Sequence, residues 1–164
     1  MSLSSKILAI SAVTAALATP AAAQGVVTQK NISLGMAQSI AQAALEKCIS
    51  MGFKVAVSVV DRGGMVLVTL HGDGAGLHTN EGAERKAYTA RTFSQTSNDL
   101  IKRLTERPET AFGTRQYTRV IALPGGIPIK VGNEVIGAVG VSGSPGKDDD
   151  CSQAGIDKVA DQLK

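Results

Sequence analysis

The first clear pattern in the chain is a run of apolar side chains at three- and four-residue spacing. The run comprises Met36, Ala37, Ile40, Ala41, Ala44, Leu45, Cys48 and Ile49. That spacing places its members on one face of an α-helix. Ser33 precedes the run as a good N-cap, and Gly52 follows it as a good stop signal. The pattern therefore predicts a helix between Ser33 and Gly52.

Short apolar segments rich in β-branched residues predict the strands. Residues 54–61 (KVAVSVVD) and 65–71 (MVLVTLH) flank Arg62-Gly63-Gly64, which suits a tight turn, so the two segments predict a hairpin. Three more strands are expected later in the chain, with Gly132-Asn133 turning between the last two. Their expected bounds are Arg119–Leu123, Ile127–Val131 and Glu134–Ser142.

Helical patterns account for much of the remaining chain. Thr79 or Asn80 can cap a helix that reaches about Phe93, and Asp148–Asp150 can begin a last helix that runs through Leu163. A short helix is expected over Leu100–Thr105, and a polar connector over Pro108–Tyr117. Tight turns between strands require antiparallel pairing. The sequence thus predicts an α+β fold with a five-stranded antiparallel sheet flanked by helices.

The N-terminus has the pattern of a secretory signal peptide. Lys6 is followed by a short apolar run over 7–18, and Ala21-Ala22-Ala23 supplies the small residues of a cleavage site. We expect a signal peptide over 1–23, cleavage after Ala23 and one domain over 24–164. The apolar run is too short to span a membrane, so no membrane span is expected after cleavage.

Charge and cysteine content limit the environment and the partners. The formal net charge is only +3, and no Lys/Arg cluster is flanked by aromatic residues, so nucleic acid is not expected as a partner. The chain has two cysteines, Cys48 and Cys151. In an exported chain an even cysteine count favours a disulfide, although two buried thiols remain the alternative. The expected location is periplasmic or secreted.

The candidate chemistry centres on His78, which lies between a glycine-rich loop over 72–77 and a helix start. Neither His78 nor His71 has a second ligand at metal-site spacing, so a closed protein-only metal site is not indicated. A single imidazole can serve as the axial ligand of a haem iron, or it can simply fix its loop by hydrogen bonding. Arg85, Lys86 and Arg91 follow on the same helix, where they could pair with carboxylates or form a solvated face.

A second candidate is the glycine-rich segment 123–144, LPGGIPIKVGNEVIGAVGVSGS. Gly125 and Gly126 open it, and it contains no catalytic-looking side chain. Such a segment favours a site built from backbone amides, which stabilise developing negative charge. The whole chain has only three Phe, two Tyr and no Trp. That composition argues against a deep aromatic-lined haem pocket and favours a shallow or intersubunit site.

At these residues the chain resembles the GlcG/HbpS-like haem-binding family. The matching pieces are VAVSVVDRGGMVLVTLHGDGAG, HTNEGAERKAYTARTF and GGIPIKVGNEVIGAVGVSGSPGKDDDCSQAG. The resemblance implies a five-stranded antiparallel sheet flanked by helices, and assembly into dimers or larger homo-oligomers. It also implies that His78-Thr79 and the backbone of Gly125-Gly126 are candidate ligand-binding positions.

Three functions follow as hypotheses. The first is an exported, oligomeric binding protein for haem or a related tetrapyrrole, linked to haem handling or redox sensing. In it, His78 or Thr79 approaches the iron, and Arg85, Lys86 or Arg91 pairs with propionates. The second is an enzyme acting on a small organic acid through backbone amides around Gly125, Gly126 and Gly143. The third is a partner or sensory domain without a ligand.

Overall fold

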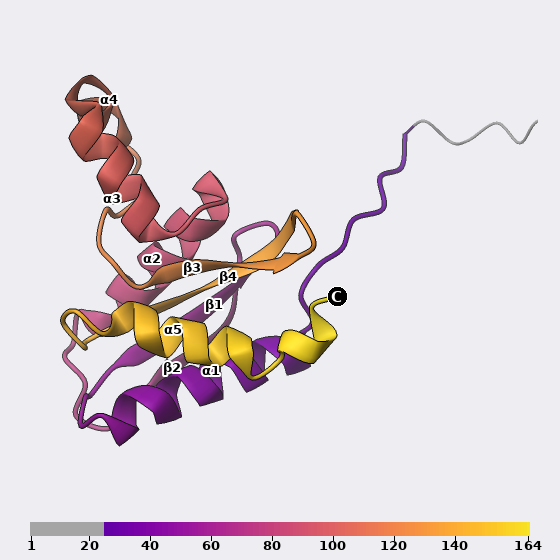
Figure 1. The fold of residues 1–164 in the computed structure, drawn as a ribbon, viewed down its shortest axis with the longest axis vertical. Coiled ribbons are helices and arrows are strands. Elements are labelled where there is room, and N and C mark those ends of the chain that lie inside the picture. The colour runs from indigo at the N-terminus through magenta and orange to yellow at the C-terminus, as the bar shows by residue number, and fades with distance from the viewer. Residues whose placement is uncertain (1–24) are drawn as a thin grey trace, which may run out of the picture.

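The computed structural model describes residues 25–164, and the expected signal peptide over 1–23 lies outside them. Its centre is a four-stranded, fully antiparallel sheet with the order β2-β1-β4-β3 (Figure 1). The strands are β1 (Ala56–Asp61), β2 (Val66–His71), β3 (Gly126–Val131) and β4 (Glu134–Ser142). The two predicted hairpins, β1–β2 and β3–β4, are both present. Pro128 lies in the edge strand β3, where a missing N–H is tolerated.

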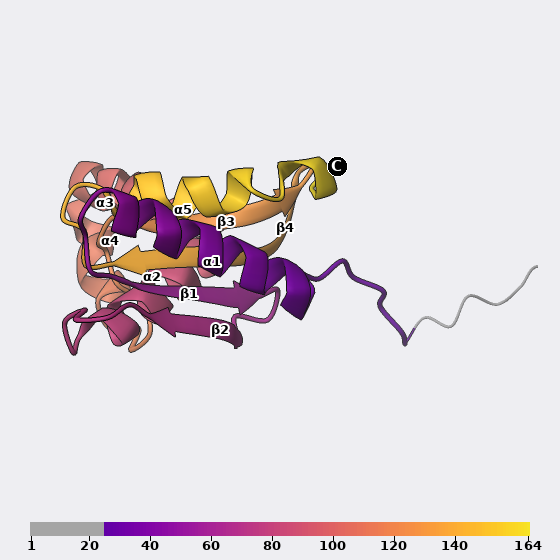
Figure 2. The ribbon, with the colours of Figure 1, turned by 90° about the horizontal axis from the view of Figure 1, so that it is seen from below.

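Helices cover both faces of this sheet (Figure 2). Helices α1 (Leu34–Ser50) and α5 (Asp148–Asp157) pack side by side on one face, and α2 (Thr79–Phe93) packs on the other, mainly against β4 and β1. Five of the six residues of β1 are buried, because this inner strand has a helix on each side. The Ser33 hydroxyl accepts a hydrogen bond from Met36 N at 3.2 Å, so the expected N-cap of α1 is confirmed.

Helices α3 (Ser97–Glu106) and α4 (Pro108–Thr114) form an arm that projects away from the sheet (Figure 1). The base of the arm is held by a small apolar cluster of Leu100, Leu104 and Val120. Residues 108–117 were expected to be a polar connector, and most of that segment is α4. A Pro at the first helical position explains why it can start a helix, since its missing N–H would be unpaired there anyway.

The predicted fifth strand over Arg119–Leu123 is wrong, because that segment is irregular in the structure. Its Ile121 N donates to Thr89 Oγ1 of α2 at 2.9 Å, and Val120 N donates to the carbonyl of Tyr117 at 3.2 Å. The side chain of Val120 is buried against the arm and not in a sheet. The apolar pattern therefore predicts burial of Val120 correctly. The backbone N–H groups of Val120 and Ile121, however, bond within a turn and to the side chain of Thr89 in α2, and not to a neighbouring strand.

The C-terminal helix is also shorter than predicted. Helix α5 ends at Asp157, and a 3-10 turn, η1 (Ala160–Gln162), continues the chain to its end. Val159 and Leu163 still pack against the core, as the apolar periodicity predicts, although this part of the chain is not α-helical.

A disulfide joins the two helices of that layer. Cys48 in α1 and Cys151 in α5 have their Sγ atoms 2.04 Å apart, and both residues are fully buried. The bond closes a loop of 103 residues, so it restricts the unfolded chain strongly. The predicted disulfide is confirmed.

Glycines set the distance between α2 and the sheet. A Cβ atom placed on Gly140 of β4 would lie 2.2 Å from the carbonyl oxygen of Ala83, and one on Gly126 of β3 would lie 2.3 Å from that of Lys86. Real Cβ atoms do not approach backbone this closely. The glycine-rich segment therefore brings α2 against β3 and β4, which no larger residue would allow.

We expect Gly140→Ala to lower the free energy of unfolding by about 1–3 kcal/mol or more, because overpacking would push α2 away from the sheet. Gly35→Ala is the matched control, since a Cβ there meets nothing within 4 Å and Ala favours the helix. Chemical denaturation of both variants measures the difference. Equal midpoints for the two would contradict the packing argument.

Candidate functional site

His78 lines a pocket of about 300 Å³ at the N-terminal end of α2. The pocket lies between that helix, the loop before β3 and the loop after β4. Its lining consists of His78, Lys86, Leu123, Pro124, Ser142, Gly143, Pro145, Gly146 and Asp148. Tertiary structure thus brings together three sequence candidates, His78, Lys86 and Gly143, that come from separate segments.

The local structure at His78 differs from the expected capping. His78 itself occupies the N-cap position, without a side-chain capping bond, and its imidazole is exposed. Thr79 is the first residue of α2, and its buried hydroxyl donates to the carbonyl of Gly76 at 2.7 Å. That bond holds the loop against the helix start. Of this neighbouring pair, His78 is therefore the side chain that can reach an external ligand.

Lys86 is almost fully buried and already has partners. Its Nζ donates to Asp148 Oδ2 at 2.7 Å and to the carbonyl of Val141 at 3.0 Å. The side chains are only 4% and 10% exposed, so water screens this ion pair little. Lys86 forms part of the pocket wall, and its charge is balanced within the protein.

The Lys86–Asp148 ion pair extends to the disulfide. Asp148 Oδ1 accepts hydrogen bonds from Ser144 N at 2.9 Å and from Ser144 Oγ at 2.7 Å. The Ser144 hydroxyl oxygen in turn lies 3.1 Å from Cys48 Sγ. Sequence reasoning treated Asp148 only as a helix-capping acid, because nothing local indicates a partner 62 residues away.

Arg85 and Arg91 lie in different surroundings. Arg85 donates to Glu81 Oε1 and to the carbonyl of Val120, each at 3.0 Å, which ties α2 to the loop before β3. Arg91 lies thirteen residues beyond His78, or about 20 Å along the helix at 1.5 Å per residue. The residues over 78–91 therefore do not converge on one ligand: His78 and Arg91 mark opposite ends of α2.

The backbone amides of Gly125 and Gly126 are also engaged. Gly125 N donates to Asp149 Oδ1 at 3.0 Å, and Gly126 N donates to Ser97 Oγ at 2.9 Å. A Cβ on Gly125 would lie 2.7 Å from Asp148 Cβ and 3.2 Å from Lys86 Cδ. These two glycines thus make room for the buried ion pair and anchor the start of β3, and their amides are not free donors for an anion.

Sequence reasoning missed a cluster of aromatic residues. Tyr88, Phe93 and Tyr117 line a pocket of about 380 Å³ between α2 and the loop after α4. Arg119 also lines this pocket. Its guanidinium stacks on the Tyr88 ring, with 3.8 Å between the Arg119 Cζ and the ring centroid. Three of the chain's few aromatic residues therefore gather at one place. The signal was absent from the sequence because Tyr117 is far from the other two along the chain.

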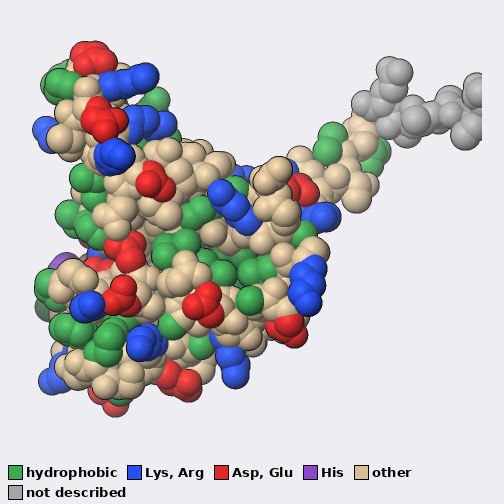
Figure 3. All heavy atoms as spheres, in the orientation of Figure 1, with side chains coloured by type: hydrophobic (Ala, Val, Ile, Leu, Met, Phe, Trp, Pro, Cys, Tyr) green, Lys and Arg blue, Asp and Glu red, His purple; other side chains and the backbone are tan. Residues whose placement is uncertain are grey.

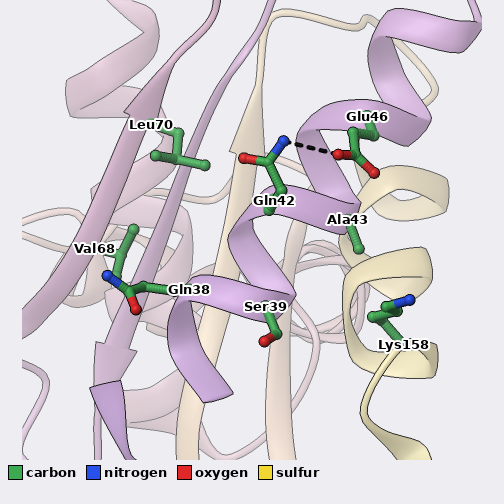
Figure 4. Close-up of a pocket in the computed structure, with 8 residues that line it drawn as sticks. All are labelled: Gln38, Ser39, Gln42, Ala43, Glu46, Val68, Leu70 and Lys158. Carbon is green, nitrogen blue, oxygen red and sulfur yellow. Dashed lines mark hydrogen bonds between the residues drawn. The ribbon is translucent and has the colours of Figure 1, made fainter. Parts of the chain in front are cut away.

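A hollow of about 610 Å³, wider than the His78 pocket, lies between α1 and the edge strand β2 (Figure 4). Gln42 Nε2 donates to Glu46 Oε1 across one turn of α1 at 2.8 Å, and Val68 and Leu70 form the β2 side. This lining contains no histidine and none of the candidate residues from the sequence. Size alone therefore does not identify a reactive site here.

Within residues 25–164 the structure gives no support for a metal centre or for a membrane-spanning helix. No group of three or more His, Cys, Asp or Glu residues is placed to hold a metal ion. In this part of the chain no helix is both long and apolar enough to cross a bilayer. On the face in Figure 3, acidic and basic side chains are interspersed and form no single basic stripe.

Comparison with known proteins agrees with this fold. The model of the HbpS-like family, described as haem degrading protein HbpS-like, matches residues 32–157. The chain belongs to the HbpS-like family. The family assignment from the sequence is thereby confirmed, with four strands in the sheet in place of five.

Solved structures and a curated protein show the same relationship. A Glu-to-Asp double mutant of Streptomyces reticuli HbpS is 35% identical, with a TM-score of 0.75, covering 85% of this chain and 96% of that one. The structure of a PduOC:haem complex is 26% identical, with a TM-score of 0.71 and coverage of 78% and 94%. An uncharacterised 15.0 kDa Citrobacter freundii protein from the dhaT–dhaS intergenic region is 34% identical over 115 residues, or 68% of this chain and 80% of that protein.

We expect Asp148→Asn to lower the free energy of unfolding of this HbpS-like protein by about 3–5 kcal/mol, because it leaves the Lys86 charge buried without its partner. Asp150→Asn is the control. The Lys147–Asp150 pair is 52% exposed on each side, so its loss should change stability by no more than about 1 kcal/mol. Urea titration compares the variants, and similar losses in both would show that the buried pair is not a major restraint.

Proposed function

We propose that this HbpS-like protein is an exported, oligomeric binding protein for haem or a related tetrapyrrole. The observation that carries the proposal is family membership together with the relative PduOC, whose structure is a haem complex and whose fold this chain shares over most of its length. The disulfide supports export, since such bonds persist mainly in oxidising compartments.

The His78 pocket is the proposed ligand site. Its imidazole is exposed and has the chemistry of an axial haem ligand. Leu77 and Leu123 beside it are 97% and 48% exposed, which gives a flat apolar ligand a surface to cover. A pocket of about 300 Å³ admits only part of a tetrapyrrole, so the rest would lie across this surface or against a second subunit.

The aromatic pocket offers a second place for the same ligand. Tyr88, Phe93 and Tyr117 can stack against a macrocycle, and Arg119 and Arg103 supply cations for propionates. It lacks an imidazole. We therefore rank it below the His78 pocket, and the variants below distinguish the two.

The alternative of an enzyme for small organic acids has less support from the geometry. It relied on free amides around Gly125, Gly126 and Gly143, and the first two of these amides bind Asp149 and Ser97 here. It also relied on Lys86 or His78 as a proton carrier, and Lys86 is held in a buried ion pair. Lys86 and Asp148 are engaged with each other, so Ser142 is the remaining polar side chain that lines the pocket with His78.

Haem titration of the purified protein tests the proposal, with absorbance followed across the Soret band and mass followed by size exclusion. We expect saturable binding that weakens about tenfold or more in His78→Ala, because the axial ligand is lost. His71→Ala is the matched control: it removes an exposed imidazole that bonds only Asn80, with 2.8 Å between Nδ1 and Oδ1.

Three other results would revise this picture. Weakening in Tyr117→Ala but not in His78→Ala would move the site to the aromatic pocket. A monomer mass with and without haem would remove the oligomer from the proposal. Absence of any Soret change in the unaltered protein would contradict haem binding itself.

Export is tested separately. Intact mass of protein recovered from the periplasm or medium should correspond to a chain starting at Gln24, because the small residues at Ala21–Ala23 fit the signal peptidase. The mass should also be lower by two hydrogens than that of the reduced chain, reflecting Cys48–Cys151. A retained Met1 in the exported fraction would overturn the cleavage prediction.

A further inference from the structure

A polar pocket of about 520 Å³ lies at the C-terminal end of α2, far from His78. It is lined by Gln29, Asn31, Asp61, Arg62, Gly63 and Arg91. These residues come from the lead-in to α1, the end of β1, the β1–β2 turn and the last turn of α2. The pocket therefore forms only where three separate segments meet, because Asp61, Arg62 and Gly63 are consecutive.

Arg91 is unusual among the basic residues of residues 25–164. It is half-buried, has no carboxylate within ion-pair distance, and its buried Nε has no hydrogen-bond partner in the structure. Burial lowers the pKa of the Arg91 guanidinium, the nearby Arg62 lowers it further, and Asp61 acts in the opposite direction. The unpartnered buried Nε is shared with Arg85 and so does not by itself indicate a ligand. Arg91 differs in that its side chain lines this pocket and makes no hydrogen bond or ion pair within the described residues, which leaves its terminal N–H groups available to a ligand there.

The neighbours of Arg91 add further donors. Asn31 Oδ1 accepts from both Ile32 N and Arg62 N at 2.9 Å, which leaves the Asn31 amide N–H groups available. Arg62 uses Nη1 for Glu134 and for the carbonyl of Lys30, so its Nη2 and Nε still have N–H groups to donate. Both side chains line the same pocket as Arg91.

The acidic groups limit what can bind. Glu134 balances Arg62, and Asp61 Oδ1 accepts from Met65 N at 2.9 Å in the β1–β2 turn. That bond helps hold the Asp61 carboxylate in the turn and outside ion-pair distance of Arg91. Arg62 and Arg91 are thus matched by Glu134 and Asp61, so the four groups carry no net charge, and the pocket suits a single small anionic group held by directed hydrogen bonds and not a polyanion.

We propose that this pocket binds the oxyanion group of a small ligand, a carboxylate or a phosphate, with Arg91 as its main donor and Arg62 and Asn31 as supporting donors. A guanidinium presents paired N–H groups that match two oxygens of such a group. The site goes beyond the proposed haem function, because about 20 Å of α2 separates it from His78.

NMR titration of the whole protein tests this, with inorganic phosphate and acetate as separate probes. The Arg91 Nε–H and Asn31 side-chain resonances should shift saturably with one probe or both. Saturation with phosphate alone assigns phosphoryl ligands, saturation with acetate alone assigns carboxylates, and saturation with both assigns a general oxyanion site.

Arg91→Gln should weaken binding about tenfold or more, the effect of losing a charge-assisted hydrogen bond. Arg107→Gln is the matched control, since it removes the same charge from an exposed position on the arm and should leave the affinity unchanged. Equal weakening in both variants, or no saturable shift in the unaltered protein, would overturn the proposal. The titration of the unaltered protein decides the matter even if Arg91→Gln does not fold.

Haem titration of Arg91→Gln separates this site from the proposed function. We expect its Soret response to match that of the unaltered protein, because Arg91 does not reach the His78 pocket. Loss of haem binding together with oxyanion binding would show that the two sites are not independent and would overturn the assignment of a separate site.

Discussion

The buried ion pair between Lys86 and Asp148 is the interaction on which the rest of the structure depends. Lys86 belongs to α2 on one face of the sheet, and Asp148 begins α5, which packs on the other face. A lysine charge that is this deeply buried is stable only with a partner close by. The pair therefore fixes the two helix layers relative to each other around the end of β4, where Lys86 also binds the carbonyl of Val141.

Other features of the fold follow from accommodating that pair. Gly125 has no side chain, and a Cβ there would crowd both Asp148 and Lys86. Ser144 turns back to bind Asp148 and lies against Cys48, which connects the ion pair to the α1–α5 disulfide. Lys86 and Asp148 themselves line the His78 pocket. Helix packing, the disulfide and the shape of the candidate site are thus parts of one connected arrangement.

The geometry of α2 divides the candidate chemistry into separate sites. His78 lies at its first turn, Tyr88 and Arg85 face the loop before β3, and Arg91 lies at its last turn beside Arg62. On the sequence these residues resemble one basic face for one ligand. A rigid helix of fifteen residues instead places them at distances that no single small group spans.

The sequence by itself determined the family, the α+β class, both hairpins and the first helix with its Ser33 cap, and it favoured a disulfide between the two cysteines. These features depend on local periodicity, on turn residues or on a motif of contiguous residues. Tertiary structure alone decided that the segment around Val120 packs against the arm and adds no strand, that Lys86 meets Asp148, and that Tyr117 joins Tyr88. It also left Arg91 without a partner. The physical reason is that an apolar residue indicates burial and a charged residue indicates a counter-charge, but neither specifies which group it will contact. That group lies far along the chain, and the contact forms only when the helices and the sheet pack together.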